Sequence, residues 1–128
     1  LGDSFMVHEA GVWQERTVLS FSDSGGRQST FIDASKAEVN VDTIDAFAEG
    51  RAISYIKMDV EGAELQALEG GKATIKQFVP KLFVAAYHYD ADLFRLPMAI
   101  WKLVPDYKIY LRKHPYVPAW ELNFLCVK

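Results

Sequence analysis

Cysteine, concentrated positive charge and long apolar runs are all scarce in this sequence. The single cysteine among 128 residues, Cys126, excludes an intrachain disulfide and a thiolate zinc cluster, and its apolar neighbours predict a packed core thiol. The net charge of −3, with its signs interspersed, leaves no basic face for nucleic acid. No apolar stretch approaches the roughly 20 residues of a transmembrane helix. We therefore expect a cytoplasmic globular protein without a nucleic-acid or membrane partner.

A glycine-rich nucleotide-binding turn is also missing. The pair Gly25-Gly26 lies in a polar segment, residues 22–29, which is expected to be a flexible surface loop. Neither a buried strand before the pair nor a helix after it marks a phosphate-binding turn. The first residue is Leu1, with no initiator methionine and no basic signal region, so we expect the chain to begin within a longer protein.

The order of the predicted elements indicates a single α/β domain over residues 1–128. Near the N-terminus, residues 4–9 and 16–22 are expected to be extended and joined by a turn, which predicts a small β-hairpin. From residue 53 onward, apolar strands alternate with helices. Strands are expected at 39–42, 53–58, 82–87, 107–112 and 121–127, and helices at 43–48, 63–69, around 75–78 and at 92–104.

The segment after the strand at 53–58 carries the most informative motif. An acidic turn follows that strand and leads directly into a helix. In open α/β sheets, the carboxyl ends of the strands present functional groups to ligands. The whole run resembles the signature of the FkbM-type S-adenosylmethionine-dependent methyltransferases: Ile56-Lys57-Met58-Asp59-Val60-Glu61-Gly62-Ala63-Glu64, with Leu68 and Gly70 following.

The resemblance covers nearly the whole chain, because the strand that ends in His88 and the last two strands also resemble this family. It implies the C-terminal portion of a class I, Rossmann-like methyltransferase fold, which is a mixed sheet flanked by helices, here with a small extra β-hairpin near the N-terminus. It also implies that the N-terminal half, with its glycine-rich turn and ribose-binding acid, is absent. We therefore expect this chain alone to bind cofactor poorly and to be inactive.

Asp59 and His88 are the expected catalytic residues. If the strands at 53–58 and 82–87 are neighbours, at a spacing of about 5 Å, both side chains open onto one crevice. Asp59 could hold the methyl acceptor, orient the cofactor or ligate a divalent cation; alternatively, it caps the following helix. His88 could take the proton from a hydroxyl group; alternatively, it is hydrogen-bonded to backbone at a strand end.

The resemblance also implies contacts with S-adenosylmethionine, whereas no metal ligand is assigned. Glu9 and Ala10 are expected to border the adenine, with a plain loop as the alternative. The other residues assigned to cofactor binding belong to the acidic turn: Asp59, Glu61 and Gly62. Gly62 is expected to allow a tight turn or close backbone approach. Glu64 is interpreted as an acid that stabilises the positive end of the helix.

These features together predict an S-adenosylmethionine-dependent methyltransferase, with O-methylation of a small molecule or a sugar as the expected reaction. Two alternatives remain. One is a non-catalytic α/β interaction module that kept the fold without a cofactor site. The other is a metal-dependent α/β enzyme that uses Asp59 and Glu61 as ligands.

The strand at 53–58 carries apolar side chains on both faces, which is typical of an interior strand covered by helices. In the resembled fold, one of its neighbours is the first strand, which this chain lacks. An unpaired apolar edge is a template for pairing with another chain. We therefore expect self-association, or cover from the missing N-terminal half, at the 53–58 edge.

Overall fold

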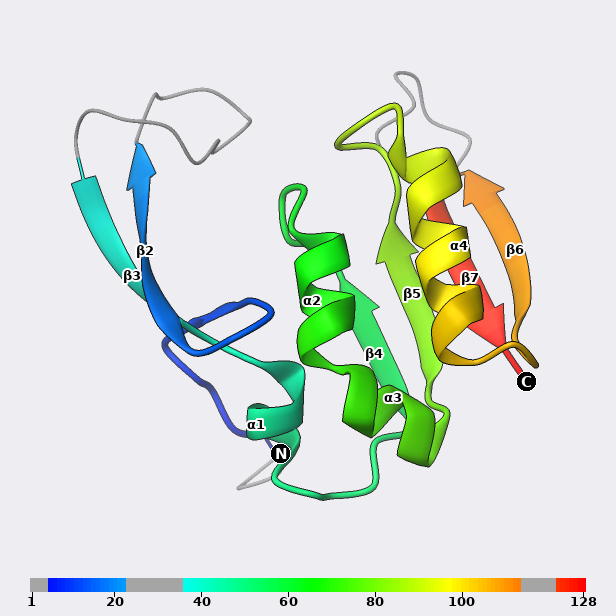
Figure 1. The fold of residues 1–128 in the computed structure, drawn as a ribbon, viewed down its shortest axis with the longest axis horizontal. Coiled ribbons are helices and arrows are strands. Elements are labelled where there is room, and N and C mark those ends of the chain that lie inside the picture. The colour runs from blue at the N-terminus through cyan, green and yellow to red at the C-terminus, as the bar shows by residue number, and fades with distance from the viewer. Residues whose placement is uncertain (1–4, 23–35, 114–121) are drawn as a thin grey trace.

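The computed structural model describes residues 5–22, 36–113 and 122–128, in which a three-stranded sheet stands beside a four-stranded sheet and its helices (Figure 1). The α/β class expected from the sequence is confirmed. The strands are β1 Gly11–Val12, β2 Thr17–Ser22, β3 Lys36–Asp42, β4 Tyr55–Met58, β5 Lys81–Ala85, β6 Lys108–Lys113 and β7 Leu122–Val127. The helices are α1 Ile44–Ala48, α2 Glu64–Gly70, α3 Lys72–Phe78 and α4 Asp92–Leu103.

The larger sheet has the strand order β4-β5-β7-β6 and is mixed, as expected. β4 and β5 run parallel, with Ile56 opposite Leu82 and Met58 opposite Val84. β7 is antiparallel to both of its neighbours. A parallel pair needs a crossover connection, and α2 and α3 supply it. Because β4 and β5 are parallel, the residues that follow these two strands meet at one edge of the sheet.

The core lies between this sheet and the helices α2, α3 and α4, which cover the same face of it in Figure 1. Leu68 from α2 and Ile100 from α4 share one buried cluster with Leu82 from β5. Each side chain of this kind contributes about 2 kcal/mol through its removal from water. Cys126 is fully buried in the same cluster, and burial raises the pKa of its thiol to about 12. The prediction of a packed core thiol is confirmed.

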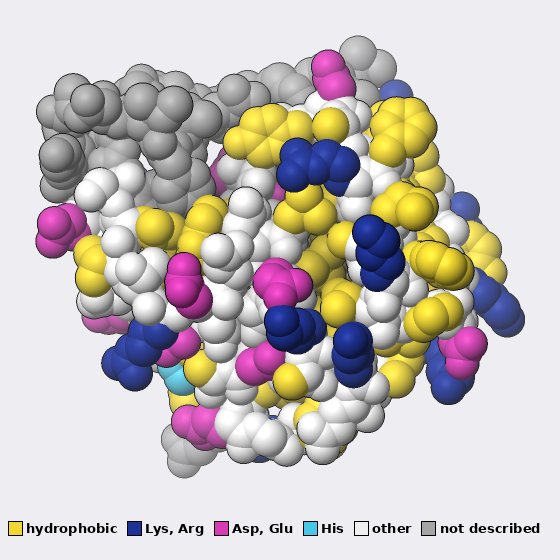
Figure 2. Space-filling model, in the orientation of Figure 1, with side chains coloured by type: hydrophobic (Ala, Val, Ile, Leu, Met, Phe, Trp, Pro, Cys, Tyr) yellow, Lys and Arg dark blue, Asp and Glu magenta, His cyan; other side chains and the backbone are white. Residues whose placement is uncertain are grey.

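The outer face of α4 is apolar as well. Phe94, Met98 and Trp101 follow one another at helical spacing and are all exposed. Figure 2 shows hydrophobic side chains gathered over this helix, with Lys and Arg side chains among them. α4 runs only from Asp92 to Leu103, and none of the helices in the described part of the chain has the length and apolar character needed to cross a membrane.

β4 lies at one edge of the larger sheet. Among the described strands, its partner is β5 alone. Tyr55 at its start is 52% exposed, whereas Met58 at its end is buried in the core. The cover on both faces that is typical of an interior strand is therefore not present within the described residues.

In the hairpin near the N-terminus, β2 pairs with a different segment from the one predicted. β2 pairs antiparallel with β3, from Thr17 opposite Val41 to Ser22 opposite Lys36. Residues 5–10 form no strand, and Gly11–Val12, expected within a turn, pair parallel with β3. All six residues of β2 pair with β3, and residues 5–9 form no strand, so the predicted pairing with 4–9 is wrong. Residues 23–35, which contain most of the predicted loop, lie outside the described part.

Helix α1 connects the two sheets. It begins as the sequence predicts, because Thr43 Oγ1 accepts a hydrogen bond from the Ala46 N–H at 3.0 Å. Asp45 in its first turn accepts the N–H groups of Ala73 and Thr74 at 3.1 and 2.8 Å. These bonds satisfy the first N–H groups of α3, whose own N-cap residue supplies no side-chain bond. The small sheet is thereby anchored to the helices over the larger one.

Candidate active site

The chain turns sharply between β4 and α2. Glu61 and Gly62 have φ angles of 52° and 95°, both in the left-handed region. A Cβ atom on Gly62 would lie 2.5 Å from Cε2 of Tyr89, so the backbone and the neighbouring ring both require glycine. The expected tight turn and close approach at Gly62 are confirmed. The turn places the side chains of Asp59 and Glu61 beside His88, within 3.6 and 3.4 Å of it.

Asp59 follows directly after β4, and Tyr87 holds its carboxylate. The Tyr87 hydroxyl donates a hydrogen bond to Asp59 Oδ1 at 2.7 Å. The N-cap residue of α2 is Ala63, and no side chain caps that helix. The alternative interpretation of Asp59 as a helix cap is therefore wrong. With its side chain 41% exposed, Asp59 can contact a ligand at the sheet edge.

His88 lies just beyond β5, and its side chain is only 7% exposed. Nε2 lies 3.6 Å from Asp59 Oδ1 and 3.4 Å from Glu61 Oε2, while Nδ1 lies 3.0 Å from Glu64 Oε1. Neither ring nitrogen has a hydrogen bond of acceptable geometry to any described residue. The alternative of a histidine bonded to backbone is therefore not observed there. Asp59 and His88 come together as the expected adjacency of their strands requires.

Glu64 is the member of this site that sequence reasoning missed. Its side chain is 1% exposed, and its Oε1 accepts the Val60 N–H at 3.1 Å. Burial raises the pKa of the Glu64 carboxyl, while the Val60 hydrogen bond and the nearby His88 ring act in the opposite direction. A signal was present in the sequence: Glu64 precedes Ala67 and Leu68 at helical spacing and so shares their buried face. A glutamate on a core-facing stripe suggests a buried partner.

A small pocket of about 250 Å³ adjoins this cluster. Gly62 and Tyr89 line it, together with Asp92 and Arg95 from α4. Asp92 is buried, and burial raises the pKa of its carboxyl. Its Oδ2 atom and the Oε1 atom of Gln66, also in the pocket lining, have no hydrogen-bond partner among the described residues. These buried oxygens can accept hydrogen bonds from a polar ligand.

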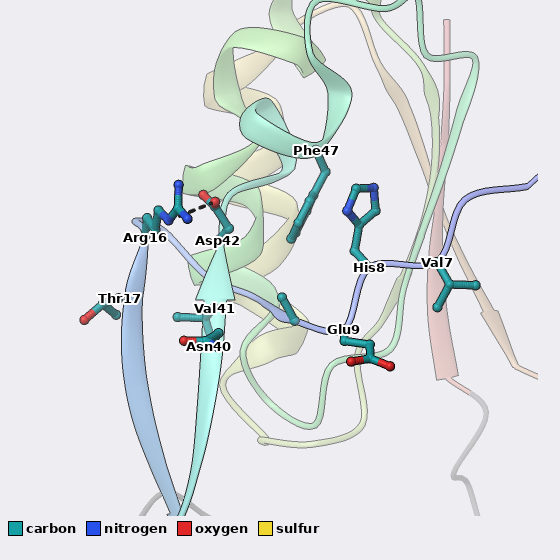
Figure 3. A pocket seen from close by; sticks show the side chains of 10 residues that line it. Val7, His8, Glu9, Arg16, Thr17, Asn40, Val41, Asp42 and Phe47 are labelled. Atoms are coloured by element: carbon teal, nitrogen blue, oxygen red, sulfur yellow. Dashed lines mark ion pairs between the residues drawn. The ribbon is translucent and has the colours of Figure 1, made fainter.

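Glu9 and Ala10 lie in a different hollow, of about 430 Å³, next to the small sheet (Figure 3). The His8 and Phe47 rings flank it with their centroids 4.7 Å apart. On its other side, Arg16 Nε lies 3.7 Å from Asp42 Oδ2. Asp59, Glu61 and Gly62 do not line this hollow, so the residues assigned to cofactor binding form two groups. Their role in cofactor binding stays a prediction.

Carboxylates surround an almost buried imidazole at the carboxyl ends of β4 and β5. Such a group can take a proton from a ligand, stabilise positive charge on the ring or hold a cation. The position agrees with the general location of ligand sites in open α/β sheets. The two exposed carboxylates, Asp59 and Glu61, form its open side.

Residues 4–117 match the Methyltransferase FkbM domain. The chain belongs to the FkbM methyltransferase family. This confirms the family indicated by the run from Ile56 to Glu64. No curated protein sequence matches this FkbM domain.

A solved structure is similar to this FkbM domain over most of the 128 residues. The crystal structure of methyltransferase FkbM from Methylobacillus flagellatus KT shares 30% sequence identity with it, at a TM-score of 0.76. The similarity covers 95% of this chain and 28% of that chain. The arrangement of sheets and helices described here therefore recurs in a solved FkbM methyltransferase, of which it represents a little more than a quarter.

Proposed function

We propose that this FkbM domain serves the transfer of a methyl group from S-adenosylmethionine to an oxygen atom of a small molecule or a sugar. One observation carries the proposal: in a chain of a methyltransferase family, Asp59 and His88 meet at the carboxyl ends of two parallel strands. When bound, the cofactor supplies an electrophilic methyl group. The protein then has to position the attacking hydroxyl group and accept its proton.

His88 is the residue best placed to accept that proton. Its Nε2 atom faces Asp59 and Glu61 at 3.6 and 3.4 Å, on the open side of the cluster. Glu64 lies 3.0 Å from Nδ1 on the buried side of the ring. We assign proton acceptance to His88 and positioning of the acceptor hydroxyl to Asp59. The Tyr87 hydroxyl, which donates to Asp59, fixes the direction of that carboxylate.

We assign the adenine side of the cofactor to the hollow beside Glu9 and Ala10. The lining suits an adenosine, because the His8 and Phe47 rings offer aromatic faces and Glu9 offers an exposed carboxylate to an amine or a hydroxyl. The remaining cofactor contacts are assigned to the acidic turn, that is, Asp59, Glu61 and Gly62.

We also propose that the chain is the C-terminal portion of a class I, Rossmann-like domain of a cytoplasmic enzyme. The order β4-β5-β7-β6, with β4 at the edge, leaves room for further strands beside β4. The glycine-rich turn that this sequence lacks would come from an N-terminal half that completes the cofactor site. The 128 residues alone are then expected to be inactive.

Calorimetric titration with S-adenosylhomocysteine tests this function. The full-length protein that contains this chain is expected to bind the compound, and the 128-residue chain to bind it at least about tenfold more weakly. Asp59→Asn in the full-length protein is expected to weaken binding, whereas Asp90→Asn, which removes an exposed acid outside the cluster, is not. Absence of binding to the full-length protein would instead favour the non-catalytic interaction module.

A further inference from the structure

We propose that Asp59, Glu64 and His88 together bind a divalent cation of the Mn²⁺ type. One ligand atom from each residue lies within 4.8 Å of the other two, although the turn after β4, helix α2 and the segment after β5 each supply one of them. The inference goes beyond the methyl-transfer function and does not depend on it. A cation can bind these three side chains whether or not a methyl group is transferred nearby.

The distance between His88 and Glu64 is that of two ligands that share an ion. His88 Nδ1 and Glu64 Oε1 are 3.0 Å apart, yet the ring makes no hydrogen bond of acceptable geometry to a described residue. Two ligands about 2.1 Å from one ion and at right angles to each other lie roughly 3.0 Å apart. Asp59 Oδ1 lies on the Nε2 side of the ring, at 3.6 Å, so its carboxylate, which is 41% exposed, has to move toward Nδ1 to complete the set.

Several polar atoms of the two buried members, His88 and Glu64, are unsatisfied. Both ring nitrogens of His88 and the Oε2 atom of Glu64 have no hydrogen-bond partner among the described residues, and both side chains are more than nine-tenths buried. Buried polar atoms are nearly always satisfied, so such a concentration at one point indicates a ligand. The Oε1 atom of Glu64 is oriented by the Val60 N–H, and Asp59 by the Tyr87 hydroxyl. Outer hydrogen bonds of this kind commonly orient metal ligands.

The charge of the cluster also favours a cation. Asp59, Glu61 and Glu64 all lie within 3.6 Å of one imidazole ring. A protonated ring would balance only one of these negative charges. Two carboxylates with one imidazole, and no thiolate nearby, are ligands that suit Mn²⁺, with Zn²⁺ as the competing ion. The exposed side next to Glu61 leaves positions for water or for an acceptor oxygen.

Mn²⁺ titration followed by electron paramagnetic resonance tests the site, because the signal of free Mn²⁺ is lost on binding. The full chain is expected to bind Mn²⁺ with a dissociation constant below about 1 mM. Asp59→Asn and His88→Gln should each weaken binding by at least about tenfold. Asp90→Asn, a matched loss of one negative charge on the same loop as His88, should leave the affinity unchanged.

Three results would overturn the site: no binding below that concentration, equal affinity in Asp59→Asn and wild type, or an equal loss in Asp90→Asn. The test does not depend on a variant of the core, because Asp59 is partly exposed and asparagine keeps an acceptor for Tyr87. Titration of S-adenosylhomocysteine in EDTA separates this inference from the proposed function. Cofactor binding without Mn²⁺ binding rejects the cation site alone, whereas Mn²⁺ binding without cofactor binding rejects the methyl-transfer function alone.

Discussion

His88 Nδ1 lies 3.0 Å from Glu64 Oε1, and both side chains are almost completely buried. Glu64 opens α2 and His88 follows β5, so this contact ties the crossover helix to the end of the strand beside β4. Water screens the interaction poorly at this depth, which strengthens it relative to a surface pair. The exposed Asp59 and Glu61 carboxylates therefore lie on the solvent side of His88, whereas the buried Glu64 lies on its inner side.

Replacing Glu64 by glutamine should change how stability depends on pH. Burial raises the pKa of Glu64 above its ordinary value of 4.5, so the folded protein holds this proton more tightly than the unfolded chain does. The stability from that proton is complete below pH 4.5 and is lost as the pH rises through the folded-state pKa. The glutamine of Glu64→Gln has no proton to lose. As the pH rises from 4.5 to the folded-state pKa, the free energy of unfolding of this variant should therefore increase relative to that of wild type, by up to about 1.4 kcal/mol per pH unit.

Urea unfolding in EDTA, at a series of pH values from about 4 to 8, measures this difference. Glu69→Gln is the matched control, because it removes an exposed carboxylate from the same helix. Its curve should stay parallel to that of wild type apart from the loss of its pair with Lys72. A Glu64→Gln curve that also stays parallel to wild type would contradict a raised pKa at this residue.

Alanine at Gly62 should destabilise the protein more than alanine at Gly50. Both glycines have positive φ, 95° and 73°, so both substitutions strain the backbone by about 1–2 kcal/mol. Only at Gly62 does the new Cβ also meet a neighbour, at 2.5 Å from Tyr89, whereas nothing lies within 4 Å at Gly50. Urea unfolding of both variants gives the difference. In a Tyr89→Ala background the two costs should become equal, and a persistent gap would show that the ring is not its cause.

The sequence predicted the part of the site that follows from strand order, namely Asp59 and His88. It missed Glu64, whose place in the site depends on the packing of the tertiary fold. Asp59 and His88 each follow an apolar strand, and the carboxyl ends of adjacent parallel strands share an edge, so their meeting could be predicted. The burial of Glu64 depends on how α2 packs against the sheet, and an acid at a helix start has a sufficient local explanation.

The partner of β2 was predicted incorrectly for a related reason. Segments 4–9 and 39–42 both read as extended, and competition between distant partners, rather than local propensity, decides which of them pairs with Thr17–Ser22. The edge position of β4 is likewise a property of the whole sheet and not of its own apolar residues.

In the full-length protein, Asp59→Asn and His88→Ala should lower the rate of the proposed methyl transfer far more than they lower stability. Loss of a positioned proton acceptor typically costs about 10²- to 10⁴-fold in rate. Thermal unfolding should show little change for Asp59→Asn, because its side chain is partly exposed and the Tyr87 bond is kept. Methyl-transfer assays and thermal melts on the same preparations separate the two effects. Turnover close to that of wild type in both variants would contradict a catalytic role for these two residues.

The β4 edge should make this chain associate with itself. β4 pairs with β5 alone among the described strands, and Tyr55 exposes an aromatic ring beside its free backbone groups. Such an edge is a template for another strand, and a charge placed on it opposes pairing. Light scattering on the chain should therefore give a mass of at least twice its 14.5 kDa, and Tyr55→Glu should shift this mass toward that of the monomer.

Tyr110→Glu is the control. It lies on β6 at the opposite edge of the same sheet, adds the same charge and should leave the mass unchanged. A monodisperse, cooperatively melting wild-type monomer would mean that the edge is already covered, and an equal effect of both substitutions would show that net charge, not β4, governs association.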